Sequence, residues 1–157
     1  MRRDWHSGQS KAYSYRDDPA VPAFPDDRPI IVFDGHCALC SGFARFVLRH
    51  DRHGRIRLLA AQTPLGQALM RHLDLDPVNF ETNVLLEDGR AYIKSDGSLR
   101  MFIHLGLPWS ICKVLRLAPR SLLDALYDWV ARNRMRWFGY QAQCFRGDPA
   151  QRDRFLA

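Results

Sequence analysis

Two cysteines separated by two residues are the clearest chemical feature of this sequence. Cys37 and Cys40 follow a short apolar run, residues 30–33, and an Asp-Gly pair, Asp34 and Gly35. The apolar run predicts a buried strand, and the Asp-Gly pair predicts a turn that leads into a helix. Two thiols one helical turn apart can close a small disulfide ring, so this spacing indicates a redox dithiol.

The position of the two cysteines gives them different expected roles. Apolar residues recur at helical spacing after Cys40, so we expect Cys37 at or just before the first turn of a helix. Unpaired backbone N–H groups and the helix dipole stabilise a thiolate at that place. We therefore predict that Cys37 is the nucleophile and that the less exposed Cys40 resolves a mixed disulfide.

Two neighbouring side chains could tune these thiols. An imidazolium at His36 would lower the pKa of Cys37, and Asp34 could accept a proton from Cys40 during resolution. Each residue also has a purely structural interpretation. His36 could be an exposed turn residue, and Asp34 could be a turn or N-cap carboxylate bonded to backbone amides.

Further sequence blocks accompany the dithiol. They are residues 85–90, residues 95–100, Tyr127, residues 132–134, residues 137–139 and Cys144. With Asp34, Cys37 and Cys40, and in this order, they resemble the DCC family of predicted thiol-disulfide oxidoreductases, named for an Asp and two Cys. The resemblance covers about residues 29 to 156. It implies a thioredoxin-like fold and disulfide exchange with a protein or small-molecule substrate and a thiol electron donor, without a cofactor.

One position departs from the thioredoxin pattern. In that fold a cis-proline normally precedes the strand that faces the dithiol, whereas Thr82 and Asn83 hold this place here. A cis bond before a non-proline residue costs about 3–4 kcal/mol, so we expect a trans peptide. Thr82 could offer its hydroxyl or backbone to a substrate, or it could simply begin a strand. Gly35 and Arg134 are further candidates for tuning or substrate contact.

Strands and helices are expected in the order β-α-β-α-β-β-α. The expected strands are residues 30–33, 56–61, 83–87 and 90–94, and the expected helices are residues 40–50, 64–73 and 96–105, with helical segments near 109–117 and 120–134. Asp88 and Gly89 predict a tight hairpin turn. The order predicts a thioredoxin-like α/β fold: a mixed sheet of about four strands, helices on both faces, and a helical C-terminal extension.

Composition predicts one domain behind an N-terminal tail. The chain has 157 residues, of which 46% are hydrophobic, which is enough for a single core. Residues 1–28 combine prolines and charges with few aliphatic side chains, so we expect a flexible tail, followed by the thioredoxin-like domain at 29–157. No apolar run suited to an export signal follows Arg2 and Arg3, and four cysteines are too few for a disulfide-built scaffold. We therefore expect a cytoplasmic protein.

The C-terminal part mixes basic and aromatic side chains within residues 127–140. A helical repeat of apolar residues predicts a core stripe whose basic neighbours face solvent; the repeat comprises Leu122, Leu123, Leu126, Trp129 and Val130. An anion or acidic-substrate site near Arg132 and Arg134 is the alternative. The formal charge of +6 would permit contact with nucleic acid, which we consider the least favoured partner. Charges interrupt the longest apolar stretches, so we expect neither a membrane span nor a membrane partner.

The two remaining cysteines leave two other functions open. Cys112 has apolar neighbours and is expected to pack as a small buried hydrophobe, whereas Cys144 could approach the dithiol only if the chain end folds back. The C-x-x-C pair could instead be half of a structural zinc site, completed by Cys144, Cys112 or His36. It could also belong to a thioredoxin-like binding module that does not turn over.

Overall fold

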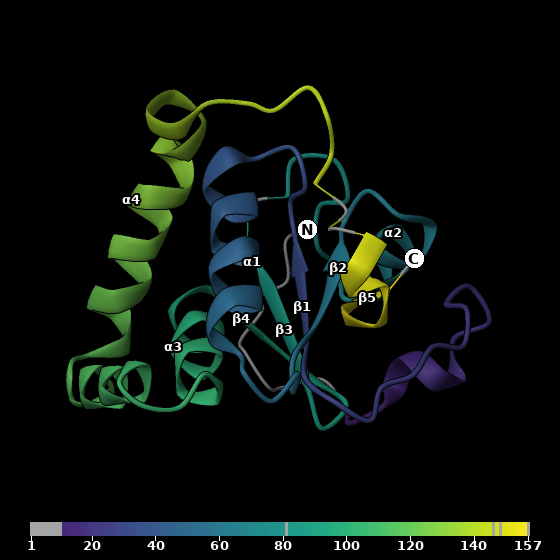
Figure 1. Cartoon of the computed structure of the whole chain (residues 1–157), viewed down its shortest axis with the longest axis horizontal. Helices are drawn as coiled ribbons and strands as arrows, with labels where there is room; N and C mark the ends of the chain where they lie inside the picture. The colour runs from purple at the N-terminus through teal and green to yellow at the C-terminus, as the bar shows by residue number, and fades with distance from the viewer. Residues whose placement is uncertain (1–10, 81, 146, 148, 157) are drawn as a thin grey trace.

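A mixed sheet with the strand order β4-β3-β1-β2-β5 lies at the centre of the molecule (Figure 1). The computed structural model describes residues 11–80, 82–145, 147 and 149–156. The strands are β1 (Ile30–Phe33), β2 (Arg57–Ala60), β3 (Val84–Glu87), β4 (Arg90–Ile93) and β5 (Phe155–Leu156). The α-helices are α1 (Ala38–His50), α2 (Pro64–His72), α3 (Lys94–His104) and α4 (Arg120–Phe138). Three 3-10 helices complete the described elements: η1 (Ser14–Asp17), η2 (Trp109–Leu117) and η3 (Pro149–Arg154).

Strand β1 is the central strand and carries the dithiol loop at its end. It pairs in parallel with β2 and antiparallel with β3, so that Ile31 lies opposite Leu58 on one side and Leu85 on the other. All four of its residues are buried. A continuous apolar run is what a strand needs when both of its faces are covered by helices.

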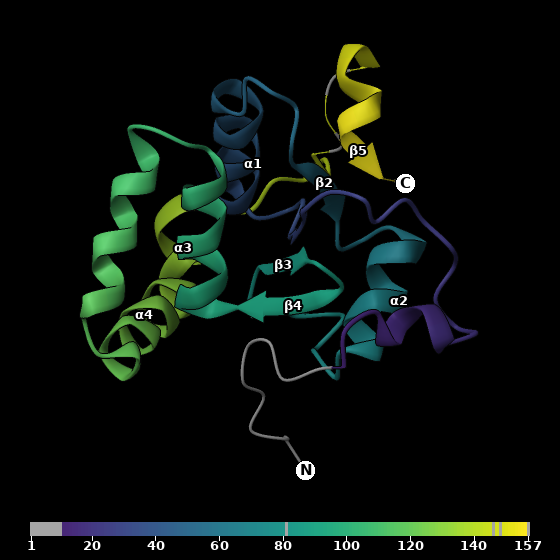
Figure 2. The same ribbon diagram turned by 90° about the horizontal axis from the view of Figure 1, so that it is seen from below.

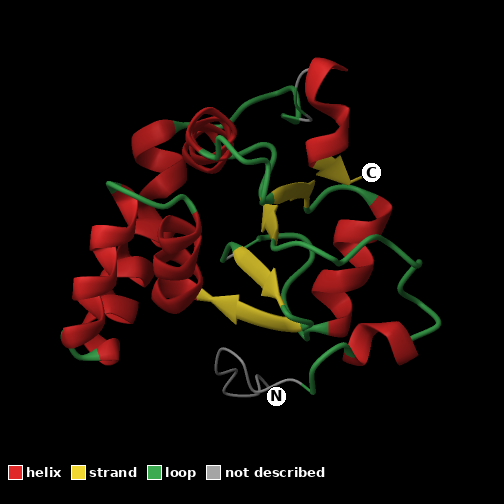
Figure 3. Ribbon diagram, turned by 60° about the horizontal axis from the view of Figure 1, so that its bottom comes forward, coloured by secondary structure: helices red, strands yellow, loops and turns green. Residues whose placement is uncertain are grey.

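Alternate residues of β1 enter two different hydrophobic clusters. Ile30 and Val32 pack in the cluster that includes α2, whereas Ile31 and Phe33 pack in the cluster that includes α1 and α3. Figures 2 and 3 show the same division, with α2 on one side of the sheet and α1, α3 and α4 on the other. Helices therefore cover both faces of β1, as the sequence predicted.

The element order is the one predicted from the sequence, with small shifts at the ends. Helix α1 begins at Ala38 rather than at residue 40, and the segment at residues 109–117 is a 3-10 helix. The hairpin turn has positive φ angles at Asp88 (49°) and Gly89 (72°), as Asp-Gly turns require. Strand β5 was not predicted, because two residues carry no periodicity.

A buried ion pair brings the chain end back to the sheet. Arg154 contacts the Asp51 carboxylate at 2.6 Å and donates a second hydrogen bond to the Ile56 carbonyl at 2.9 Å. Strand β5 pairs with β2, on the opposite side of the sheet from β4. The segment between α4 and η3 therefore passes over the end of the molecule where β1 meets α1 (Figure 1).

The N-terminal segment packs on the domain where the structure describes it. Residues 1–10 of the expected tail lie outside the described residues. Tyr15 is 2% exposed in the α2 cluster, its hydroxyl donates to Asp26 at 2.8 Å, and the backbone of Tyr13 bonds to Gly89. Residues 11–28 therefore contribute to the core, and the packing shows no break at the boundary expected after residue 28.

Replacement of Tyr15 by alanine tests this packing. We expect Tyr15→Ala to lower the free energy of unfolding in urea by about 3–5 kcal/mol, the usual cost of truncating a buried aromatic side chain. The exposed Asp17 on the same short helix provides the control, and Asp17→Ala should cost less than about 0.5 kcal/mol. Equal unfolding curves for the two variants would show that the segment is a mobile tail in solution.

Candidate active site

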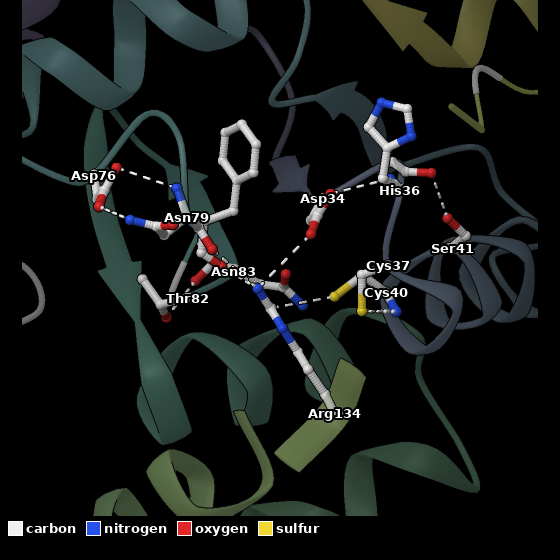
Figure 4. A network of polar contacts seen from close by, with 12 residues as sticks. Asp34, His36, Cys37, Cys40, Ser41, Asp76, Asn79, Thr82, Asn83 and Arg134 are labelled. Carbon is white, nitrogen blue, oxygen red and sulfur yellow. Dashed lines mark hydrogen bonds and ion pairs between the residues drawn. The ribbon is translucent and has the colours of Figure 1, made fainter. Parts of the chain in front are cut away.

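The dithiol lies where β1 ends and α1 begins. Cys37 is the N-cap residue of α1, with extended backbone angles of −78° and 121°, and its sulfur accepts a hydrogen bond from the Cys40 N–H at 3.4 Å. Figure 4 shows the two side chains next to each other. The predicted place of Cys37 at the helix start is confirmed, and one N–H of the first turn, that of Cys40, points at its sulfur.

The two thiols differ in acidity because they share one hydrogen bond. The Cys40 thiol and backbone N–H donate to the Cys37 sulfur, and with the charge of Arg134 they lower the pKa of Cys37 to about 6. The same hydrogen bond, together with burial, raises the pKa of Cys40 well above its ordinary value. One thiol is therefore prepared as a thiolate while its neighbour keeps its proton.

Asp34 is a buried carboxylate held by the loop that it begins. One oxygen accepts hydrogen bonds from the His36 N–H at 3.0 Å and from the Gln62 amide at 2.7 Å. The Gln62 oxygen in turn accepts the Gly35 N–H at 3.0 Å. The structural interpretation of Asp34 thus holds, and its charge also acts on both cysteines. Sequence reasoning missed Gln62, whose position after β2 carries no recognisable signal.

Arg134 joins the dithiol to the loop before β3. This α4 side chain is 6% exposed; its guanidinium lies 3.7 Å from the second Asp34 oxygen and donates to the Cys40 sulfur at 3.5 Å (Figure 4). It also donates to the backbone carbonyls of Asn79, at 3.4 Å, and Phe80. The expectation that the basic residues of this segment face solvent is wrong for Arg134, because the acidic and carbonyl oxygens around it replace water.

Thr82 belongs to a neighbouring internal network. Its hydroxyl donates to the Tyr127 oxygen at 3.2 Å and accepts the Lys94 N–H at 3.2 Å, while the Asn83 N–H also donates to Tyr127, at 3.0 Å. Burial raises the pKa of Tyr127. The hydroxyl of Thr82 therefore ties β3 to α3 and α4, which agrees with its structural interpretation. The peptide between Thr82 and Asn83 is trans, as expected.

Cys37 is fully buried beneath a segment that we call the strap, residues 139–145. The strap pairs with the dithiol loop through backbone hydrogen bonds: Ala38 to Gly139 at 3.3 Å, Gln141 to His36 at 2.7 Å, and Phe145 to Gly35 at 3.0 Å. Tyr140 forms a β-bridge with Cys37. Exposure is 0% for Cys37 and 3% for Cys40. The prediction that Cys37 is the more exposed thiol is wrong, because the covering segment is about a hundred residues away in sequence.

The His36 ring faces the strap. It stacks on the ring of Tyr140 at a centroid distance of 5.2 Å, and its Nδ1 lies 2.9 Å from the Gln141 carbonyl. The expectation of an exposed turn residue is therefore wrong, since His36 is half-buried. In this arrangement His36 binds the strap to the loop.

Cys144 reaches the same loop from the end of the strap. Its sulfur lies 3.7 Å from the Gln62 amide oxygen, and a Cβ atom at Gly35 would collide with that sulfur. The chain end therefore folds back, which was the condition for Cys144 to approach the dithiol. A glycine is needed at position 35 because a side chain there would collide with the Cys144 sulfur. Cys112 lies on η2, where the neighbours Ile111 and Val114 are exposed, so its expected apolar surroundings are not buried.

Of the five residues in the predicted core stripe of α4, three face outward, whereas Leu123 and Val130 are half-buried. Leu122, Leu126 and Trp129 are 62%, 56% and 51% exposed. The side of α4 that meets the rest of the molecule carries Tyr127 and the buried Arg134 instead. The prediction is therefore wrong for Leu122, Leu126 and Trp129, because an apolar repeat shows which residues share a face of a helix and not where that face points.

Within residues 11–80, 82–145, 147 and 149–156, no three His, Cys, Asp or Glu side chains gather in a way that could hold a metal ion. These residues therefore offer no further ligands that would complete a zinc site with Cys37 and Cys40. Among the described helices, none is both long and apolar enough to cross a membrane.

Comparison with known proteins points to one family. The model of the DCC1-like thiol-disulfide oxidoreductase family matches residues 31–140. The uncharacterized protein YuxK of Bacillus subtilis is 34% identical over 127 residues, which cover 81% of this chain and 93% of that protein. A chloroplastic DCC family protein of Arabidopsis thaliana is 39% identical over 120 residues, or 76% of this chain and 70% of that protein. No solved structure gives a significant match.

Substitution of Arg134 tests the electrostatic part of this geometry. We expect the thiolate absorbance of the reduced protein to rise with a midpoint near pH 6, and the midpoint to move upward in Arg134→Gln because the positive charge beside Cys37 is lost. Arg134→Lys keeps the charge and should shift the midpoint less. Arg132→Gln, at an exposed position of the same helix, is the control. A midpoint unchanged by Arg134→Gln would contradict the assignment.

Proposed function

Because the chain belongs to the DCC1-like thiol-disulfide oxidoreductase family, we propose that it exchanges disulfides through Cys37 and Cys40. The hydrogen-bonded pair at the N-terminus of α1, in which the pKa of Cys37 is lowered and that of Cys40 is raised, carries this proposal. A nucleophile and a resolving thiol require this difference. The substrate class is a disulfide in a protein or a small molecule.

The reaction in the reducing direction has two steps. The Cys37 thiolate attacks one sulfur of the substrate disulfide; a Cys37–substrate disulfide forms, and the other substrate sulfur leaves as a thiolate that takes up a proton. Cys40 then loses its proton and attacks the Cys37 sulfur, so the Cys37–Cys40 disulfide forms and the second substrate thiolate departs and is protonated. Two electrons and two protons pass to the substrate, and a thiol donor later restores the dithiol.

Asp34 and Arg134 have complementary roles in this scheme. Asp34 is the acceptor for the Cys40 proton, because it is a buried carboxylate whose charge acts on both thiols. Arg134 stabilises the thiolate that forms when Cys40 is deprotonated, through the N–H that it donates to the sulfur. His36 is a positioning residue in this proposal, since its ring contacts the strap.

Substrate access requires the strap to move. An attacking thiolate must meet the disulfide in line, and a sulfur with 0% exposure cannot do so in this conformation. Gly139, at the end of α4, and Gly147, beyond the strap, both have φ angles of 84°, a conformation that glycine adopts without strain. We place the hinges of the opening at these two residues.

The proposed setting is a reducing compartment. The four cysteines are unpaired in the structure, and their small number suits a cytoplasmic protein, the location that we propose. The alternatives are a binding module that keeps the fold without turnover and a structural zinc site. Neither alternative requires the acidity of Cys37 and Cys40 to differ.

Single cysteine variants test the exchange reaction. We expect Cys37→Ser to abolish reduction of a model disulfide, and Cys40→Ser to accumulate a mixed disulfide at Cys37, which mass spectrometry of the intact protein would detect. Cys112→Ser, on η2, is the matched control and should retain the wild-type rate. Full activity of Cys37→Ser would rule out the proposed nucleophile, and loss of bound metal with loss of folding in that variant would favour the zinc alternative.

A proline in the strap tests the access step. Gln141→Pro removes the N–H that bonds to the His36 carbonyl, so we expect faster alkylation of Cys37 by iodoacetamide. A net hydrogen bond of about 1 kcal/mol corresponds to an increase of roughly fivefold. Gln143→Pro lies in the same strap at an exposed position and is the control. Equal alkylation rates in the two variants would show that the strap does not limit access.

A further inference from the structure

The exposed apolar side chains of this protein are concentrated in one part of the chain. Of the thirteen large hydrophobic residues that are exposed among the described ones, twelve lie within residues 107–140, and the other is Val78. Monomeric proteins rarely leave so many apolar side chains together in water without a partner. We name the surface of η2 and α4 the apolar-basic face; its main members are Leu107, Ile111, Leu117, Leu122, Leu126 and Trp129.

The geometry of the two helices explains why these side chains point outward. Leu122, Leu126 and Trp129 are spaced by four and three residues, so they share one side of α4. The opposite side holds Arg134 against the dithiol. Both η2 and α4 pack on α3, and in Figures 1 and 2 they form the end of the molecule opposite α2. Leu107 lies just before η2 and Leu117 is its last residue, and each is 86% exposed.

The charges of this face are almost all positive. Residues 107–140 contain six basic and two acidic side chains. Both acidic residues contact α3: Asp124 bonds to Ser95, and Asp128 lies 2.9 Å from the Lys94 ammonium. Arg120 is exposed and lies 3.6 Å from Asp124, and the other exposed charges around the apolar residues are those of Lys113, Arg116, Arg132 and Arg136.

From this combination we propose that the apolar-basic face docks on an anionic lipid bilayer. Leucine, isoleucine and tryptophan side chains enter the boundary between headgroups and acyl chains, and the lysine and arginine side chains bind the lipid phosphates. A second copy of the chain is a poorer occupant, because two positive faces repel each other. The expectation of no membrane partner rested on the charges that interrupt the apolar stretches, whereas the proposed docking uses those charges to bind lipid phosphates.

The strap that covers the dithiol begins at the end of the docking helix α4. Helix α4 ends at Phe138, and the strap that covers Cys37 starts at the next residue. Tyr140 of the strap is 67% exposed and stacks on His36. The docking surface and the strap thus meet at the end of α4, and bilayer binding does not depend on the exchange chemistry.

Flotation with lipid vesicles tests the proposal. The full chain should bind vesicles that contain phosphatidylglycerol and bind weakly to vesicles of pure phosphatidylcholine. We expect Leu117→Ser to weaken binding about tenfold through lost apolar burial, and Arg132→Glu to weaken it about tenfold through lost attraction to the lipid phosphates. Val78→Ser is the matched apolar control, and Arg52→Glu is the charge control on an exposed loop residue.

The outcomes separate the possible occupants. Circular dichroism and the Cys37–Cys40 exchange rate should be unchanged in all four variants, so loss of binding cannot be attributed to misfolding. Absence of binding to phosphatidylglycerol vesicles, or equal losses in the face and control variants, would overturn the proposal. A dimer in light scattering that Leu117→Ser dissociates, without vesicle binding, would assign the face to a second copy.

Discussion

The buried guanidinium of Arg134 is the interaction on which the rest of the site depends. It is the one cationic group in contact with both the Asp34 carboxylate and the Cys40 sulfur among the described residues. A carboxylate that is 3% exposed is costly to bury without such a partner. The same group bonds to the backbone before β3, so one side chain from α4 aligns the dithiol loop, the sheet and the C-terminal helix. This placement explains why α4 presents its apolar stripe to solvent.

The chain end supplies the second constraint. A buried ion pair between Arg154 and Asp51 returns the C-terminus to β2, so the strap must cross the start of α1. There its backbone pairs with the loop that holds Cys37, and the sulfur has no contact with solvent. In the proposed reaction, a thiolate shielded in this way is kept from unselective oxidation, and exchange takes place only when the strap opens. Acidity and access are thus set by different parts of the chain: the hydrogen bond between Cys40 and Cys37, helped by the charge of Arg134, sets the first, and residues 139–145 set the second.

Local signals predicted much of the fold and the centre of the site. The apolar run of β1, the Asp-Gly hairpin and the place of Cys37 before α1 each follow from a few neighbouring residues. Contacts between distant segments carried no such signal: Gln62 on Asp34 and Tyr140 over Cys37 arise only after the chain has folded. The α4 repeat was ambiguous, because an apolar stripe is as compatible with an outward face as with a core. The burial of Arg134 resolves that ambiguity, since it fixes which side of α4 faces inward.

The redox state of each cysteine across a series of glutathione buffers, mapped by alkylation and peptide mass spectrometry, tests the central claim most directly. We predict that Cys37 and Cys40 form and lose one disulfide reversibly, as a single two-electron couple, while Cys112 stays reduced. The midpoint of that couple would also show whether the protein acts as a reductant or an oxidant. Failure of Cys37 and Cys40 to pair at any buffer ratio, or pairing of Cys37 with Cys144 in their place, would contradict the account.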